Sequence, residues 1–136
     1  MSFSDLLENE ILDHVFGANV YTSPATVWFG LSTADPLDTW AGLAEPVGNG
    51  YARVARVNDN TTFQAAAAGL VDNAIEIAFP EASGSWGTVT HVALFTHITS
   101  TGLANSLGSG ALGTSKAVGA GDTARFQVGS LSITLD

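Results

Sequence analysis

The sequence predicts a mainly β protein, an antiparallel, jelly-roll-like β-sandwich of about 7–9 strands with one N-terminal α-helix. The clearest observation lies near the C-terminus, where Leu131, Ile133 and Leu135 alternate with Ser and Thr residues. A period of two places apolar side chains on one face of a strand and polar ones on the other. Similar short runs recur between turn signals. With 136 residues, 46% of them apolar, we expect a single domain, residues 1–136.

Residues 2–16 are expected to form the helix. Ser2 or Ser4 can cap its free amide groups, and Gly17 is placed to end it. An apolar stripe recurs every fourth residue along this segment: Phe3, Leu7, Ile11 and Val15. We expect the stripe to pack on the sheet or on a neighbouring subunit, so its members are candidate interface residues.

The rest of the domain, residues 21–136, is expected to form the sandwich. In one of its longer runs, Ile75, Ile77 and Phe79 are expected to point inward. The expected strands cover residues 26–32, 51–57, 61–66, 70–79, 88–97, 123–128 and 130–135, with one or two weaker, glycine-interrupted strands within 103–118.

Residues 33–50 form a connection that is long for a compact domain, which favours a contact role. Trp40 lies in this loop, and we expect it to be an exposed contact residue. Asp35, in the same loop, is a further interface candidate. Trp86 stands in a glycine-rich turn, where we expect it to cap the core, and it stays among the interface candidates.

The charge balance indicates which partners the chain can bind. The net charge is −9, and the four basic residues are scattered, which argues against nucleic acid and against anionic membranes as partners. No run approaches the ~20 apolar residues of a membrane span. Charged residues make up only 12% of the chain, against about 25% in an ordinary domain. A surface with so few charges favours contact with other protein, hence a homo-oligomer.

No motif predicts an enzyme, a cofactor or a metal site. The run GSGALG (108–113) fits the letters of a dinucleotide fingerprint, but no helix follows it to receive a pyrophosphate. His91 and His97 are close to 20 Å apart on an extended strand, too far for one metal ion. The acidic loops lack the ligand spacing of a calcium loop, although a cation bridging neighbouring subunits stays an alternative. We therefore expect no catalytic, cofactor-binding or metal-binding residue.

Seven segments stand out along the chain: NEILDHVF (9–16), YTSPATV (21–27), ADP (34–36), GNGYAR (48–53), FP (79–80), WGTVTH (86–91) and VGAGDT (118–123). In this order they resemble a family of small virion proteins of tailed bacteriophages that are usually labelled tail fibre proteins. Residues 39–44 and 61–70 have no counterpart in that pattern.

The resemblance implies a non-enzymatic structural protein on the virion exterior, made in the host bacterial cytoplasm. It would serve as a capsid decoration, a vertex protein or a tail-fibre-type accessory, bound to other phage virion proteins. Virion symmetry favours trimers or pentamers over dimers, and of these we expect a trimer. The alternative is a receptor- or glycan-binding module of the adsorption apparatus, in which Trp28, Trp40 and the 33–50 loop stack on a host surface glycan.

Overall fold

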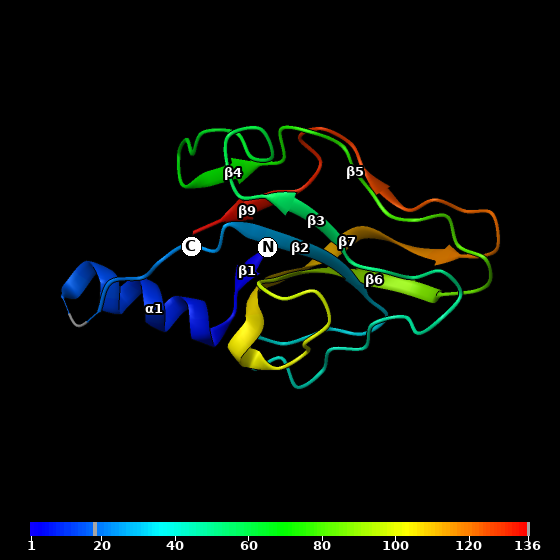
Figure 1. The fold of residues 1–136 in the computed structure, drawn as a ribbon, viewed down its shortest axis with the longest axis horizontal. Helices are drawn as coiled ribbons and strands as arrows, with labels where there is room; N and C mark the ends of the chain where they lie inside the picture. The colour runs from blue at the N-terminus through cyan, green and yellow to red at the C-terminus, as the bar shows by residue number, and fades with distance from the viewer. Residues whose placement is uncertain (18, 136) are drawn as a thin grey trace.

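The computed structural model describes residues 1–17 and 19–135 and confirms a mainly β fold with an N-terminal helix (Figure 1). The described elements are, in chain order, β1 (Ser2–Phe3), α1 (Asp5–Phe16), β2 (Thr26–Ser32), β3 (Val54–Val57), β4 (Leu70–Asp72), β5 (Ile77–Ala78), β6 (Gly87–Phe95), the 3₁₀ turn η1 (Leu103–Asn105), β7 (Ser106–Val118), β8 (Arg125–Phe126) and β9 (Ser132–Thr134).

An antiparallel sheet forms the centre of the molecule, and its described strands follow the order β1-β7-β6-β2-β3. Two small antiparallel pairs, β4 with β9 and β5 with β8, lie along one side of it (Figure 1). Ile77 of β5 and Leu131, the residue before β9, belong to the same apolar cluster as Phe29 and Leu31 of β2. The fold is therefore sandwich-like, with one large layer and one layer made of small pieces.

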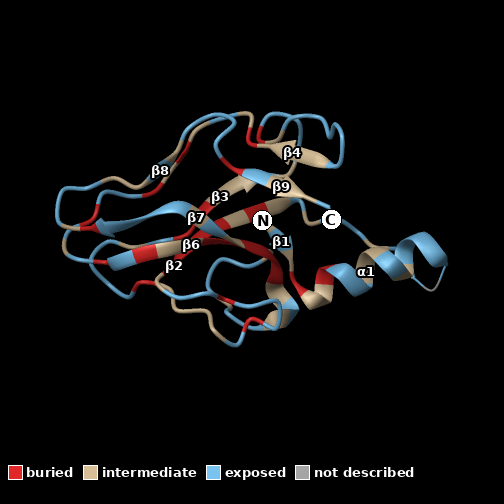
Figure 2. Cartoon of the chain, turned by 180° about the vertical axis from the view of Figure 1, so that it is seen from behind, coloured by how far each residue is buried: buried red, intermediate tan, exposed pale blue. Residues whose placement is uncertain are grey.

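Both faces of the central sheet are covered. Alternation along β2 directs Phe29 toward the small β pairs and Trp28 toward the opposite face. On that opposite face, Phe95 of β6 packs with Trp40 from the 33–50 loop. Burial on both sides explains why β2 and the end of β6 contain few exposed residues (Figure 2).

The helix begins three residues later than expected. Ser4 caps it, because its hydroxyl accepts a hydrogen bond from the Leu7 amide at 3.3 Å, and Gly17 ends it in a left-handed conformation at φ 88°. The two residues before Ser4 form β1, in which Phe3 pairs with Gly108 of β7. A Cβ atom on Gly108 would collide with the Ser2 carbonyl oxygen, so glycine permits this close pairing.

Two predicted strands are wrong. Residues 61–66 form turns and an isolated bridge, since the Asp59 carboxylate accepts hydrogen bonds from the amide and hydroxyl of Thr61. The expected strand 70–79 is divided into β4 and β5 at Asn73, whose side chain bonds backbone groups of other segments. Ile77 is fully buried there, whereas Ile75 is 36% exposed.

The C-terminal half also differs in detail from the prediction. Within 103–118, the weak, interrupted strands prove to be one continuous 13-residue strand, β7, which is paired with β6 over most of its length. β8 and β9 are shorter than predicted. Leu131 is buried, but Leu135 is 66% exposed. The last residue of the predicted apolar face therefore lies outside the core.

Candidate functional site

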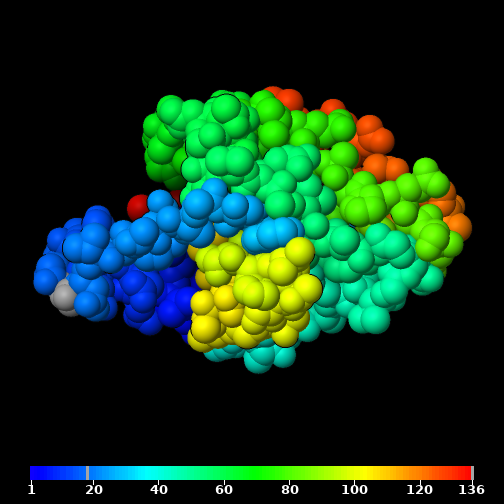
Figure 3. All heavy atoms as spheres, in the orientation of Figure 1, coloured from blue at the N-terminus to red at the C-terminus, as the bar shows by residue number. Residues whose placement is uncertain are grey.

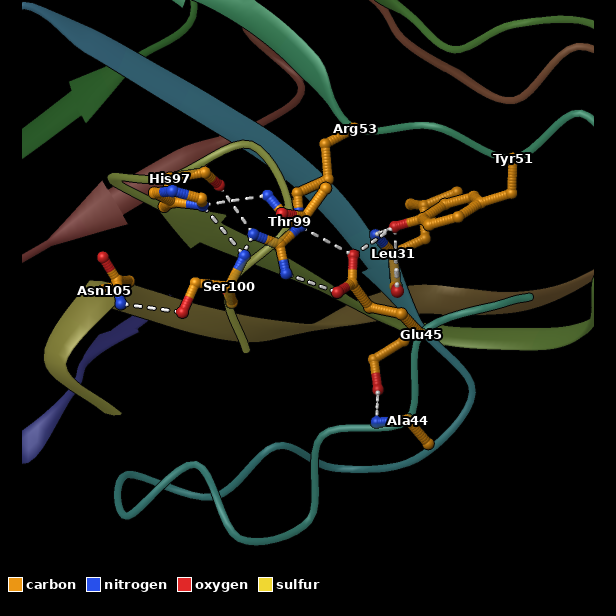
Figure 4. Close-up of polar contacts among 10 residues, drawn as sticks. Leu31, Ala44, Glu45, Tyr51, Arg53, His97, Thr99, Ser100 and Asn105 are labelled. Atoms are coloured by element: carbon orange, nitrogen blue, oxygen red, sulfur yellow. Dashed lines mark hydrogen bonds and ion pairs between the residues drawn. The ribbon is translucent and has the colours of Figure 1, made fainter. Parts of the chain in front are cut away.

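A buried polar cluster joins the GNGYAR segment to two loops, and we call Glu45, Tyr51 and Arg53 the Arg53 cluster (Figure 4). The Arg53 guanidinium binds the Glu45 carboxylate through two parallel hydrogen bonds, with Nε to Oε1 at 2.9 Å. The Tyr51 hydroxyl donates to the same Oε1 at 2.7 Å. The Arg53 side chain is only 3% exposed and that of Glu45 only 13%.

The remaining contacts of the Arg53 cluster are to backbone and to an aromatic ring. Arg53 Nη1 donates to the carbonyl oxygens of His97 at 2.7 Å and Ser100 at 2.9 Å, and the guanidinium lies 3.3 Å above the centroid of the Phe95 ring. Tyr51 Oη accepts a hydrogen bond from the Leu31 amide at 2.9 Å. The Arg53 cluster thereby connects the 33–50 loop, the segment before β3 and the loop after β6.

The charges of Arg53 and Glu45 are buried and paired with each other, which is typical of a structural ion pair. Burial raises the pKa of the Tyr51 hydroxyl above its ordinary value, and the negative charge of Glu45 raises it further. Close approach of Glu45 and Phe95 also depends on Gly30, because a Cβ there would lie 2.7 Å from the Phe95 ring. Sequence reasoning missed this cluster. Its signal was the two-residue spacing of Tyr51 and Arg53, which places both on one side of an extended segment.

The prediction that Trp40 is exposed is wrong. Its side chain is 5% exposed and meets the Phe95 ring edge-on, with centroids 5.5 Å apart and planes at 82°. The backbone of Trp40 takes a positive φ of 65° and its amide donates to the Leu37 carbonyl at 3.0 Å. The loop therefore turns its tryptophan inward against β6, and Trp40 cannot stack on a glycan in this conformation. The most exposed apolar residue of that loop is Val47, at 91%.

Trp86 lies in the core, as the interpretation of it as a core cap expects. It is 4% exposed, its indole N–H donates to the Asn49 carbonyl at 2.9 Å, and its ring meets Tyr51 edge-on. Asp35 remains on the surface, with its side chain 60% exposed, and its Oδ1 lies 3.7 Å from Nε2 of His91. Trp86 therefore offers no free surface to a partner, whereas Asp35 does.

The apolar stripe of α1 is buried at one end and exposed at the other. Leu7 is 8% exposed and Ile11 is half-buried, whereas Val15 is 63% exposed. Near its base, the helix borders an apolar hollow of about 470 Å³ that is lined by Phe3, Leu7, Ile11 and residues of the body such as Phe63. The structure thus separates the four stripe residues into a packed base and a free tip.

The described residues show no arrangement of a metal centre. No group of three His, Asp or Glu side chains in residues 1–17 and 19–135 is placed to hold a metal ion. His97 lies beyond the end of β6, and its Nδ1 accepts hydrogen bonds from the amides of Thr99 and Ser100. No helix in this part of the chain has the length and hydropathy of a membrane span.

Comparison with known proteins identifies one family whose model covers nearly the whole chain. A family model described as podophage GP4 fiber I protein gp80 matches residues 2–134, a stretch that includes α1, the central sheet and both small β pairs. A search of the curated proteins found no significant match. The resemblance to phage tail fibre-type proteins is confirmed by this match, which runs nearly from end to end. The chain belongs to the podophage GP4 fiber I protein gp80 family.

Proposed function

We propose that this protein is a non-enzymatic structural subunit on the exterior of a tailed-phage particle, and that it works there as a homo-oligomer, with a trimer favoured. The observation that carries the proposal is the match of residues 2–134 to a podophage fibre protein family. The subunit would bind other virion proteins, in a tail-fibre-type or capsid-decoration position.

The surface of the protein supports an assembling role. Several large apolar side chains are more than half exposed, and those with the largest exposed fractions besides Val47 are Val20 at 82% and Phe16 at 80%. Phe16 lies in the last turn of α1, and Val20 follows shortly after it. Phenylalanine is enriched in the cores of protein–protein interfaces, which favours Phe16 as a contact residue. The low proportion of charged residues reduces the desolvation cost of covering this surface.

Attachment to the particle is the direct test. Particles lacking the protein are mixed with the purified chain, sedimented and imaged with a gold-labelled antibody against it. We expect the chain to sediment with the particles and the label to lie on their exterior, at the tail or at the capsid. A chain that stays in the supernatant while binding host cells would contradict the structural role and favour the receptor-binding alternative.

A further inference from the structure

The tip of α1 presents an apolar face that this chain does not cover. Leu12, Val15 and Phe16 lie on one side of the helix and are 54%, 63% and 80% exposed. The opposite side is occupied by the returning chain, where the Tyr21 amide donates to His14 Nδ1 at 3.2 Å. Figure 3 shows the N-terminal segment as a projection from the body. The exposed face is therefore available to a partner.

Acidic residues accompany this apolar face. α1 contains four carboxylates and no Lys or Arg: Asp5, Glu8, Glu10 and Asp13. Glu8 lies one turn before Leu12 on the same side of the helix and is exposed. A partner for α1 should therefore combine an apolar hollow with positive charge.

Such a surface exists on the same chain, between β7 and β8. Two neighbouring hollows of about 380 and 310 Å³ share Leu112, Lys116, Arg125 and Phe126 in their walls, and we call this surface the Lys116 groove. Lys116 is exposed and forms no ion pair with the described residues. Arg125 is 3.6 Å from Glu76, and both side chains are more than a third exposed. Asp122 also borders the groove, where its Oδ2 accepts a hydrogen bond from the Gly119 amide at 2.8 Å.

The groove also follows an open sheet edge. β1 covers β7 only at Gly108 and Ser109, so within the described chain no strand pairs with the outer edge of residues 111–118. That edge is about 25 Å long, and the 12-residue α1 about 18 Å. An unpaired edge can pair with another chain, and proteins protect such edges with charged side chains such as lysine or by covering them with a helix or loop.

We propose that α1 of one copy docks in the Lys116 groove of the next copy. Its apolar side chains would pack against Leu112 and Phe126, and its carboxylates would lie beside Lys116 and Arg125. Charge complementarity supports this choice of partner. Of the four basic residues in the chain, Arg53 is buried with Glu45, and two of the other three line this groove. The inference rests on the proposed homo-oligomer and identifies the contact that builds it.

The positions of the two surfaces show that the contact must form between copies. α1 lies at one end of the long axis, and β8 and the end of β7 lie toward the other (Figures 1 and 2). A helix therefore cannot reach the groove of its own chain, and the contact joins two different copies. Repeated head-to-tail, this contact closes into a ring, of which a trimer is the smallest, whereas two copies that exchange helices reciprocally form a two-fold dimer.

Sedimentation equilibrium tests the helix side of the contact. Phe16→Asp places a charge on the apolar tip and is expected to raise the dissociation constant of the oligomer at least tenfold. Val47→Asp is the matched control, since Val47 is also an exposed apolar residue but lies in the 33–50 loop. It should leave the dissociation constant unchanged. Dissociation by Val47→Asp and not by Phe16→Asp would overturn the proposal.

A charge exchange tests the pairing of the two surfaces. Glu8→Lys and Lys116→Glu should each weaken assembly, and the double variant should recover most of the loss because the attraction is restored with reversed sign. The control pairs Glu8→Lys with Arg56→Glu, a basic residue outside the groove, and should show no recovery. Equal recovery in both double variants would mean that net charge alone governs assembly, and would overturn the proposal.

Cross-linking separates this contact from its alternatives, because the chain contains no cysteine. Val15→Cys and Thr114→Cys variants are prepared singly and oxidised alone or mixed. A disulfide dimer that forms only in the mixture supports the helix-in-groove contact. A dimer of Thr114→Cys alone would show pairing between two β7 edges and overturn it. Oligomers that form without cross-links and resist Phe16→Asp would overturn this contact and leave the homo-oligomer standing. A wild-type monomer at every concentration would contradict both.

Discussion

Arg53 and Glu45, which are eight residues apart in the chain, form a buried two-bond ion pair at the meeting point of three loop segments. Breaking such a pair from one side leaves an uncompensated buried charge. Arg53→Ala should lower the free energy of unfolding by about 3–5 kcal/mol, measured by urea denaturation. Arg53→Lys retains the charge but not the two parallel hydrogen bonds, so it should lose stability as well.

Arg56→Ala is the control for this prediction. Arg56 donates to the Ala55 carbonyl at 2.9 Å and lies in no ion pair with the described residues, so its loss should change stability by about 0.5 kcal/mol or less. Similar stabilities for the two alanine variants would mean that the Arg53 cluster does not hold the loops together.

The raised pKa of the Tyr51 hydroxyl predicts that the free energy of unfolding falls at high pH. Because the pKa of its hydroxyl is raised in the folded protein, the unfolded chain releases this proton first as the pH rises above about 10. The contribution of Tyr51 to the free energy of unfolding is fully present below pH 10. Above pH 10 it falls, by at most about 1.4 kcal/mol per pH unit. Tyr51→Phe should show a shallower fall in urea denaturations between pH 9 and 11. Tyr21, whose pKa is also raised, contributes equally to the wild type and to the variant. If stability falls with pH equally steeply in both proteins, the loss does not come from Tyr51.

Trp40→Ala should destabilise the fold. The buried ring packs edge-on against Phe95, so truncation leaves a cavity and should cost about 3–5 kcal/mol in chemical denaturation. Trp40→Phe should cost less, because the indole N–H is buried without a hydrogen-bond partner among the described residues. Val47→Ala, in the exposed part of the same loop, serves as the neutral control. A Trp40→Ala variant with unchanged stability would mean that Trp40 is not packed in the core.

Asn73 should be more sensitive to substitution than any exposed asparagine. Its fully buried amide donates to the carbonyls of Ile75 at 2.7 Å and Gln127 at 2.8 Å, and its oxygen accepts from the Leu131 amide at 2.9 Å. Asn73→Asp places an oxygen against those two carbonyls and should cost about 3 kcal/mol or more at pH 7.

The pH dependence identifies the cause of this loss. At pH 4 and below, protonation removes the charge and restores one donor, so the loss should shrink when melting curves are compared across pH. Asn9→Asp, on the exposed side of α1, should change stability little at either pH. An Asn73→Asp variant as stable as the wild type at pH 7 would refute the role of the amide donors.

Leu7 and Leu12 make a matched pair on the helix. Leu7 is 8% exposed and Leu12 is 54% exposed, so Leu7→Asp buries a charge and Leu12→Asp does not. Leu7→Asp should lower the free energy of unfolding by about 2–4 kcal/mol. Leu12→Asp should leave it nearly unchanged when tryptophan fluorescence is followed at concentrations below assembly. Equal effects would mean that the helix base does not pack on the body.

Local signals in the sequence determined the fold class, the helix and several strands. The hydroxyl of Ser4 and the conformational freedom of Gly17 act within one turn of the helix, so the neighbouring residues suffice to predict its end and narrow its start to two candidates. β2 was predicted with its observed bounds, because apolar side chains at every second residue indicate a strand directly. The family resemblance also came from the sequence alone, through the order of its segments.

The tertiary structure decided what depends on distant partners. Trp40 carries no sign in its neighbours that Phe95 will meet it, and the division of β4 from β5 depends on Asn73 reaching Gln127 and Leu131. Arg53 and Glu45 attract each other only because folding places both where water is excluded. Which residues are buried and which pair depends on which segments face one another in the fold. Those contacts join residues far apart in the sequence, so no short stretch of it can predict them.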